Sequence, residues 1–328
     1  MPELPPNGRT NKELLRALRT PVARFYPCDF HVHSLGSYDV WQAAHYNSLP
    51  QELRDLAQQY ASGVVFPMSK DPKDPSGFDE QMAKQPLIEG FYSAIETRRN
   101  QLMLSEGTSD SDNWCVVGIT DHNTAHFSAA LSQYAWSCRS NKHIIVLPGI
   151  ELDVTFPVAN AVDRCQVHVL CLFAPCTKHS DIRLAINDSR PSDCPSWSFG
   201  SALDVVSLSD FVHKIRNHAS YPAICIGAHV WSKKGVQNEP TKLILASLDA
   251  EIARLEGEFG RASSESEHNE LREIEIRLNE LKSRKDDADA VHLDVLRIIG
   301  LCGFDALQVR DRTHERAKRK ITSVGCSI

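Results

Sequence analysis

Four short segments that carry histidine and carboxylate side chains constrain the fold of this chain most strongly. They span residues 29–34 (DFHVHS), 120–123 (TDHN), 148–151 (PGIE) and 227–230 (GAHV). Apolar runs typical of buried strands precede the last three, at residues 116–119, 144–147 and 223–226. Metal ligands delivered from the ends of several strands of one α/β core converge on one site. The pattern therefore predicts a metal-dependent hydrolase.

The histidines and acids of these segments also form an ordered set. Along the chain come H-x-H (His31, His33), an acid six positions later (Asp39), T-D-H (His122), G-x-E (Glu151), a histidine that begins an H-x-L-x-L-F-like strand (His168) and a histidine after a strand (His229). From about residue 25 onwards, this order resembles the PHP (polymerase and histidinol phosphatase) superfamily of metal-dependent phosphoesterases. The resemblance depends on the ordered set, since a lone H-x-H is weak evidence.

The resemblance implies an α/β fold, a distorted (β/α)7-type barrel, with two or three divalent ions (Mn, Zn or Fe). It assigns a first ion to His31, His33 and Glu151, a second to Glu151, His168 and His229, and a third to Asp39 and His122. It gives the catalytic role to His31, His33, His122, Glu151 and His229. Mixed nitrogen and oxygen donors suit these metals without selecting one of them. Two ions about 3.5–4 Å apart can polarise a phosphoryl oxygen and generate hydroxide near neutral pH.

Each candidate has a simpler interpretation when it is taken alone, because a histidine near a strand end is more often a surface or core residue than a ligand. Asp39 is the weakest member, since aspartate is common in Gly-Ser loops for reasons of turn formation. The histidines without motif context are predicted to be solvated or on helix surfaces: His126, His143, His179, His213, His218, His268 and His292. His45 lies near the first segment and is not assigned to the site.

The family pattern closes with D-x-H after a short strand, and this element is missing here. Residues 320–328 (KITSVGCSI) match the strand and the Gly-x-Ser lead-in, but no Asp and His follow. Three explanations stay open: the chain is the N-terminal piece of a longer protein, the gene is naturally truncated, or Asp311 and His314 supply the ligands. We favour a truncation, natural or engineered, because Asp311 and His314 precede the final strand and match the family poorly.

Composition agrees with one enzyme domain that carries additions. The 328 residues can bury a large core, and a single α/β barrel commonly takes about 200–250 residues. No apolar run approaches the roughly 20 residues of a membrane span, and the N-terminus has no basic-then-apolar signal. The ten cysteines contain no C-x-x-C pair. We therefore expect reduced thiols in a cytoplasmic protein that does not act at a membrane.

The sequence divides into four parts. Residues 1–24 are predicted to form an N-terminal helical extension, residues 25–240 the barrel, residues 241–290 a helical hairpin, and residues 291–328 the C-terminal part of the barrel. Near residues 35–107 the barrel carries an inserted excursion, with helices at 51–61 and 85–105 around a Pro/Asp/Lys-rich loop at 67–78. This excursion is interpreted either as a lid that selects substrate or as a surface elaboration.

The hairpin is predicted from two heptad-like apolar seams. The first comprises Leu248, Ile252, Leu255 and Phe259, and the second Leu271, Ile274, Leu278 and Leu281. The break at residues 260–264 (GRASS) is typical of a turn. Residues 249–289 contain seven Lys or Arg and thirteen Asp or Glu, a net charge of −6. The rest of the chain contains 29 basic and 29 acidic residues, so the whole negative excess lies on the hairpin. Such a hairpin suits a protein partner or self-association better than nucleic acid, or it is a solvated strut.

The substrate is inferred from position and from resemblance. Lys233 follows His229 and Arg310 follows an apolar run at residues 304–309, so both are candidate phosphate-binding residues at the mouth of the barrel. The organisation resembles the N-terminal module of PHP–ATPase proteins, in which a PHP domain with a helical insertion precedes an ATPase. This resemblance implies a nuclease or nucleotide phosphodiesterase that acts with an ATPase partner or module. The alternatives are a phosphomonoesterase on a small metabolite and a non-catalytic metal-binding docking module.

Overall fold

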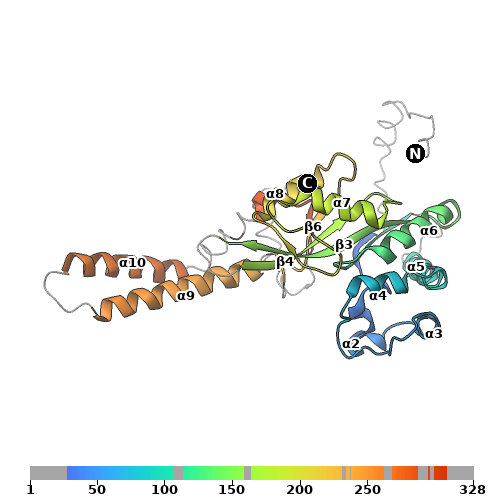
Figure 1. Cartoon of the computed structure of the whole chain (residues 1–328), viewed down its shortest axis with the longest axis horizontal. Helices are drawn as coiled ribbons and strands as arrows, with labels where there is room; N and C mark the ends of the chain where they lie inside the picture. The colour runs from blue at the N-terminus through green and yellow to red at the C-terminus, as the bar shows by residue number, and fades with distance from the viewer. Residues whose placement is uncertain are drawn as a thin grey trace.

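The structure, a computed structural model, describes residues 28–105, 114–158, 164–230, 234–236, 238–261, 268–286, 295 and 299–308. A mixed α/β body is joined to a long two-helix arm (Figure 1). The predicted N-terminal helical extension, the candidate residues Lys233 and Arg310, and the tail with Asp311 and His314 lie outside the described residues.

One curled sheet forms the centre of the body. Its strands lie in the order β1 (Cys28–Val32), β2 (Cys115–His122), β3 (Ile144–Pro157), β4 (Arg164–Leu172), β6 (Ile224–Gly227) and β7 (Ala306–Leu307). The short β5 (Leu203–Asp204) pairs with the far half of β3. Strands β1, β2 and β3 are mutually parallel, as are β6 and β7, whereas β4 is antiparallel to both β3 and β6.

The antiparallel strand β4 departs from the regular β/α alternation that the sequence predicts. Strands β3 and β4 are joined by only six residues, 158–163. A parallel crossover needs about a dozen residues or more, so a connection this short can only join antiparallel neighbours. Among the described residues, the sheet is therefore a curled half-barrel of mixed direction, and a complete (β/α)7 barrel is not confirmed.

The excursion after β1 forms a helical layer that packs on the sheet. It contains η1 (Tyr38–Trp41), α2 (Ala43–Tyr46), α3 (Gln51–Tyr60), α4 (Pro75–Met82) and α5 (Gln85–Ser105). The two predicted helices are confirmed, but the predicted loop contains the start of α4. There the side chain of Asp74 accepts a hydrogen bond from Gly77 N, and Pro75 occupies the first turn, a typical helix start. Trp41 and Met82 are fully buried in a core shared with β2 and β3, so the excursion is an integral layer.

Three further helices cover the sheet in Figure 1: α6 (His126–Lys142), α7 (His179–Ser189) and α8 (Leu208–Arg216). Helix α8 begins after Ser207, whose hydroxyl accepts a hydrogen bond from Asp210 N at 3.2 Å. Its residues Phe211, Val212 and Ile215 are buried in the largest core cluster of the body, together with residues of β3, β4 and β6. This apolar packing fixes the strands that carry the site.

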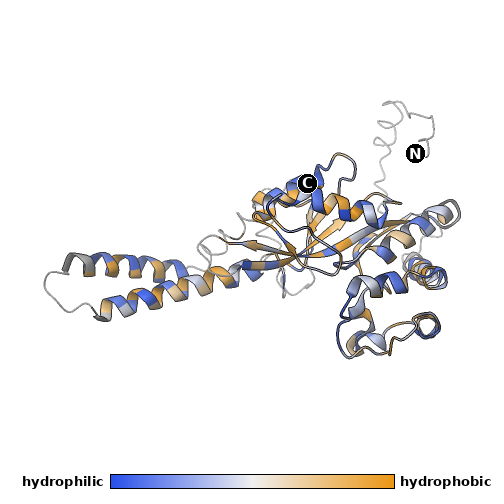
Figure 2. Ribbon diagram, in the orientation of Figure 1, coloured by the Kyte–Doolittle hydropathy of each residue, from blue (hydrophilic) through white to orange (hydrophobic). Residues whose placement is uncertain are grey.

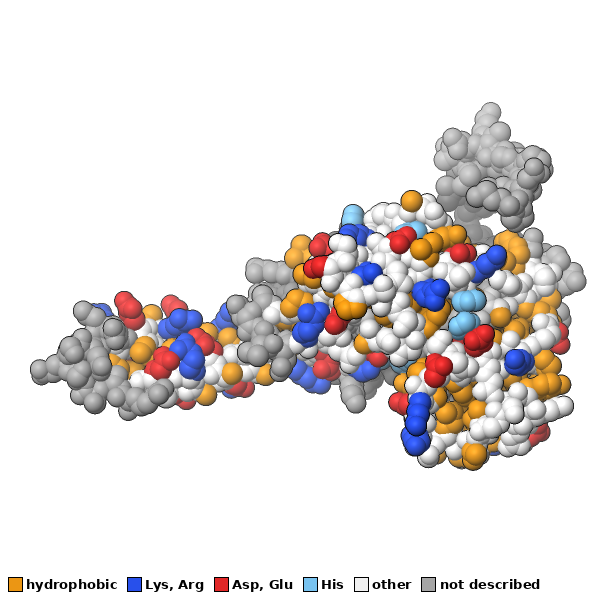
Figure 3. All heavy atoms as spheres, in the orientation of Figure 1, with side chains coloured by type: hydrophobic (Ala, Val, Ile, Leu, Met, Phe, Trp, Pro, Cys, Tyr) orange, Lys and Arg blue, Asp and Glu red, His pale blue; other side chains and the backbone are white. Residues whose placement is uncertain are grey.

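The arm confirms the predicted antiparallel hairpin. It consists of α9 (Asn238–Arg261) and α10 (His268–Asp286), and apolar residues follow their shared seam (Figure 2). Ile252, Leu255 and Leu278 are buried in that seam, with Ile274 and Leu281 packed beside them. Charged side chains of both signs cover the outside of the arm (Figure 3). No helix in the described part of the chain combines the length and the apolar composition needed to cross a membrane.

Two seam residues behave differently from the prediction. Leu248 belongs to the main core of the body, together with Ile244, because the first turns of α9 lie against β4. Phe259, near the far end of α9, is 44% exposed. The self-contained part of the hairpin therefore begins at Ile252, one helical turn later than the sequence pattern suggests. Among the described residues, three ion pairs connect the two helices: Lys282–Glu256 at 2.7 Å, Arg277–Glu251 at 3.0 Å and the closer Lys285–Asp249.

Candidate metal centre

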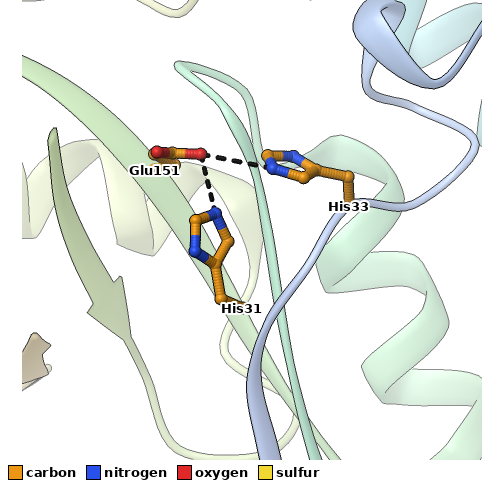
Figure 4. Close-up of side chains that lie close together, drawn as sticks. All are labelled: His31, His33 and Glu151. Atoms are coloured by element: carbon orange, nitrogen blue, oxygen red, sulfur yellow. Dashed lines mark hydrogen bonds and ion pairs between the residues drawn. The ribbon is translucent and has the colours of Figure 1, made fainter. Parts of the chain in front are cut away.

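Glu151 is fully buried, and its carboxylate lies at the centre of the predicted site. Its Oε2 atom is 3.0 Å from Nε2 of His31 and 3.4 Å from Nε2 of His33 (Figure 4). The same oxygen lies 3.5 Å from Nδ1 of His122. These three imidazoles come from β1, from the loop that follows it and from the end of β2, so segments far apart in the sequence meet at one carboxylate oxygen.

The second oxygen of Glu151 faces the other half of the sheet. Its Oε1 atom is 3.2 Å from Nε2 of His229 and in close contact with Nδ1 of His168. Asp39 completes the set from η1, with Oδ2 at 3.8 Å from Nε2 of His122. All seven predicted metal-binding residues therefore lie together in the structure.

Strand register explains why these side chains meet. In the parallel pair β2–β3, His122 lies beside Glu151, and in the antiparallel pair β3–β4, His168 lies beside Asp153. Residues two apart on a strand share a face, so Glu151 and Asp153 point to the same side of β3. The sequence pattern predicted Glu151 after the end of a strand and His168 at the beginning of one, whereas both lie within longer strands, β3 and β4.

The pKa values of Glu151 and His33 favour an anionic carboxylate and a neutral imidazole at these two positions. Burial alone would raise the pKa of Glu151, but the hydrogen bonds with His168 and His229 hold it well below its usual range. Burial is also the main cause that lowers the pKa of His33 to about 4, against the attraction of Asp39. A neutral imidazole offers the lone pair that a metal ion requires.

Behind the histidines lies a second layer of polar groups, which fixes the orientation of their rings. Asp153 Oδ1 lies 2.8 Å from Nε2 of His168, and Gln308 Oε1 lies 2.7 Å from Nδ1 of His31. Ser37 Oγ lies 3.4 Å from Nδ1 of His33. In each case the other ring nitrogen faces Glu151. Partners of this kind set the tautomer and the direction of metal-binding histidines.

Asp153 was not predicted from the sequence, and its partner Lys234 was considered only as a basic residue beside Lys233 at the phosphate-binding mouth. The Lys234 ammonium lies 2.8 Å from Asp153 Oδ1. Burial would raise the pKa of Asp153, but the hydrogen bonds from His168 and Lys234 hold it far below its usual range. The position of Asp153, two residues beyond Glu151 on an expected strand, is the sequence signal that could have identified it.

The aspartate of the T-D-H motif was also missed, and it holds the loop that follows β1 and carries His33. Asp121 is fully buried and accepts hydrogen bonds from Ser34 N at 2.6 Å and from Ser34 Oγ at 2.5 Å. Gly36 N in turn donates to Ser34 Oγ at 3.0 Å. Burial, together with the nearby buried carboxylate of Asp79, raises the pKa of Asp121 well above its usual value. Asp121 therefore positions His33 without contacting Glu151 itself.

Unusual backbone conformations gather around the centre. Asn123, His229 and Lys234 have φ angles of 52°, 49° and 59°, in the left-handed region that non-glycine residues rarely adopt. Such residues cost on the order of 1–3 kcal/mol each and persist where surrounding contacts hold them. The side chain of Asn123 is held by Asp153, through Nδ2 to Oδ2 at 3.1 Å and through Oδ1 from Asp153 N at 3.0 Å. The strain therefore lies at one predicted ligand, His229, and at two residues that bind Asp153, Asn123 and Lys234.

The donor set fits bound metal ions. In the described part of the chain, three overlapping groups of side chains can hold an ion: His31, His33 and Glu151; His33, Asp39 and His122; and His122, Glu151 and His168. A carboxylate offers about four lone-pair sites, so it cannot accept hydrogen bonds from five imidazoles at once. A cation between these groups would bind the lone pairs of those imidazole nitrogens that do not donate a hydrogen bond to Glu151. Compared with the predicted sets, His33 joins Asp39 and His122, and His122 takes the place of His229 beside Glu151 and His168.

The histidines without motif context lie elsewhere, as far as they are described. His126 and His179 stack on each other with ring centroids 4.2 Å apart, and His45 is exposed on α2. His218 Nε2 pairs with Asp188 Oδ2 at 3.3 Å near the ends of α7 and α8. The contacts described for these histidines involve residues outside the predicted site.

Comparisons with known proteins add no relative. No family model matches the chain, and neither the curated proteins nor the solved structures contain a match. The interpretation of the centre therefore rests on its own geometry and on the ordered motif set.

Proposed function

We propose that this chain is a metal-dependent phosphoesterase that hydrolyses a phosphate ester with activated water. The observation that carries the proposal is the convergence of five imidazoles and Asp39 around the buried carboxylate of Glu151. We also interpret the half-barrel as part of a PHP-type (β/α)7 barrel, because its strands deliver the motif residues in the family order.

The residues of the chain divide the work of such a site. Divalent ions held here would polarise a phosphoryl oxygen and lower the pKa of a water molecule. Glu151 supplies two oxygens that face histidines on both sides, so it can join neighbouring ions. Asp153 and Gln308 hold the rings of His168 and His31 in place. Asp121 holds the loop of His33, so preorganised contacts fix the site before a substrate binds.

Within this class we propose a nucleotide or nucleic-acid phosphodiester as the substrate, and an ATPase as a partner or a neighbouring module. Resemblance to the organisation of PHP–ATPase proteins supports this choice, and the hairpin is the segment available for a partner. The runner-up is a phosphomonoesterase on a small metabolite. A docking module that binds metal without catalysis is the third candidate, favoured by the missing D-x-H motif.

A metal-by-substrate screen tests the proposal. The purified chain would be stripped with EDTA, reloaded with Mn, Zn, Fe or Mg, and assayed with bis(p-nitrophenyl) phosphate and p-nitrophenyl phosphate. We expect hydrolysis that requires an added transition metal and is lost in Glu151→Gln and His31→Ala. Glu256→Gln on the arm and His213→Ala on α8 are matched controls, because both residues are exposed and distant from the site.

The outcomes separate the three candidates. Hydrolysis of the diester supports the proposed function, and hydrolysis of the monoester alone supports the phosphomonoesterase. Metal binding without hydrolysis of any phosphate ester supports the docking module. Activity that survives both EDTA and the two substitutions would show that the site is misassigned.

A further inference from the structure

A pocket lies at the foot of the arm, between the start of β4 and the first turns of α9. Its volume is about 410 Å³, within the range of small-molecule sites. Leu243 and Ala246 contribute apolar wall, while Arg164, Lys234 and Lys242 contribute positive charge and Glu239 a negative charge. The pocket is therefore amphipathic, with three cationic side chains around a partly apolar interior.

The basic side chains of the pocket are held by contacts that leave donors available. Nη2 of Arg164 donates to the carbonyl oxygens of Thr155 at 3.1 Å and Val205 at 2.7 Å, which leaves the other guanidinium nitrogens for a ligand. Asp204, 3.5 Å from the same nitrogen, is 60% exposed, so solvent screens its charge. The Lys242 ammonium lies 3.2 Å from Glu239 and is also 60% exposed, which leaves two of its donors for a ligand.

A chain of short contacts connects the pocket with the metal centre. Lys234 lines the pocket, and its ammonium binds Asp153, which also contacts His168, a neighbour of Glu151. The backbone repeats this link, because His168 N donates to Lys234 O at 2.9 Å. Arg164, at the far wall of the pocket, lies beside Pro157, six residues beyond Glu151 on β3 and therefore roughly 20 Å along the strand. A substrate of several linked units can span this distance.

We propose that this pocket binds a second anionic group of the substrate, a phosphate carried on an organic part, while the scissile phosphate lies at the metal centre. The inference rests on the proposed function and makes it more specific. Arg164 and Lys242 would bind the phosphate, and the apolar wall would contact the organic part. A 5′-phosphorylated oligonucleotide that is long enough to span the two places uses both sites, whereas a simple phosphomonoester uses only one.

Binding measurements on metal-free protein test the pocket without any activity. The EDTA-treated chain would be titrated by calorimetry with the dinucleotide pTpT, with TpT, which lacks the 5′-phosphate, and with inorganic phosphate. We expect pTpT to bind more tightly than TpT, and Lys242→Gln to weaken pTpT binding about fivefold or more without affecting TpT. Lys282→Gln on the arm is the matched control, since Lys282 is similarly exposed and lies outside the pocket. It should leave both affinities unchanged.

Arg164→Gln provides a second test and should weaken pTpT binding to a similar degree. Because Arg164 also binds two backbone carbonyls, the thermal unfolding of the Arg164→Gln variant would be compared with that of the wild type. If Arg164→Gln does not fold, Lys242→Gln remains the decisive variant. Equal affinities for pTpT and TpT, or no effect of Lys242→Gln, would overturn the inference even in an active hydrolase. Inorganic phosphate that binds as tightly as pTpT would overturn it too, since the pocket would then hold a free anion. A protein that hydrolyses no ester but binds pTpT in the predicted way would contradict only the proposed hydrolysis.

Discussion

Asp153 Oδ1 lies 2.8 Å from Nε2 of His168, while Nδ1 of the same ring faces Glu151. One imidazole is therefore held between two carboxylates on neighbouring positions of one strand face. If Nδ1 binds a metal ion, Asp153 fixes the ring from behind and increases its basicity, as carboxylates do behind metal-binding histidines.

This arrangement predicts that Asp153→Asn weakens metal binding by about 10–100-fold while the fold is retained. A competition titration with a chromogenic chelator would measure the affinity. Asp188→Asn is a matched control, because Asp188 pairs with His218 in a similar contact away from the centre. If Asp153→Asn binds metal as tightly as the control, His168 is not a ligand that Asp153 supports.

We expect the purified chain to carry about one transition-metal ion per chain, or more. The metal content of the Glu151→Ala variant should be lower. Glu151 contacts imidazoles through both oxygens, so its removal takes the central acidic ligand from two of the three candidate groups. Elemental analysis would measure the metal per chain. A wild-type metal content equal to that of a chelator-treated sample would contradict the prediction.

Metal affinity should rise with pH. Burial alone would lower the pKa of His168, but hydrogen bonds with Asp153 and Glu151 raise it from 6.5 to about 9. Below that value the metal-free ring carries a proton that an ion must displace, so affinity should increase by up to about tenfold per pH unit between pH 6.5 and about 9. In the metal-free protein the same shift stabilises the fold fully below pH 6.5, and this contribution is lost as the pH rises through about 9.

Calorimetry in two buffers with different ionisation enthalpies would count the protons released on metal binding. Release of about one proton near neutral pH is expected, and it should shrink in Asp153→Asn because one of the two acids that raise the pKa is removed. Binding without proton release across this range would show that His168 is neutral before the ion arrives.

Asp121→Ala should destabilise the metal-free protein and disturb the loop of His33. The substitution leaves Ser34 N and Ser34 Oγ without their buried acceptor, which costs on the order of 1–3 kcal/mol for an unsatisfied group. Urea denaturation would measure the loss. Ser34→Ala, which keeps the bond from Ser34 N, should cost less, and the reverse order would contradict this role of Asp121.

The outer part of the arm should be removable. Replacing residues 250–280 with a short Gly-Ser linker keeps Leu248 and Leu281, which pack on the main core, and removes the seam formed by Ile252, Leu255 and Leu278. We expect a folded body with its metal bound and, if a partner or a second copy docks on the arm, the loss of that association. Insoluble or metal-free protein would show that the arm supports the body.

The convergence of the seven candidate side chains was predictable because each lies in a short motif whose order is informative on its own. The helices at residues 51–60 and 85–105 and the hairpin were also predictable, from periodicity and from flanking turn residues. Helix α4 was missed although Asp74 and Pro75 are a typical helix start, because the Pro/Asp/Lys-rich composition favoured a loop. Gln308 could not be found, since its contact with His31 joins residues 277 positions apart and no local pattern marks it.

The direction of β4 was predictable only in hindsight, from the length of the chain between it and β3. The regular alternation expected from a barrel outweighed the shortness of residues 158–163. Register then decided the details of the site, because β4 places His168 beside Asp153 and not beside Glu151. Pairing between strands is a tertiary property that a single segment does not encode.

The contact between His31 and Gln308 also has a consequence for the order in which the protein is made. During synthesis, strands β1 to β4 and most of the histidines leave the ribosome long before residue 308, and chains of this size fold progressively from the N-terminus. The ring of His31 therefore lacks its distant partner until the last described strand has been translated. An ion captured earlier would meet a His31 ring without this contact, so the mature affinity of the centre should develop only after residue 308 has been translated.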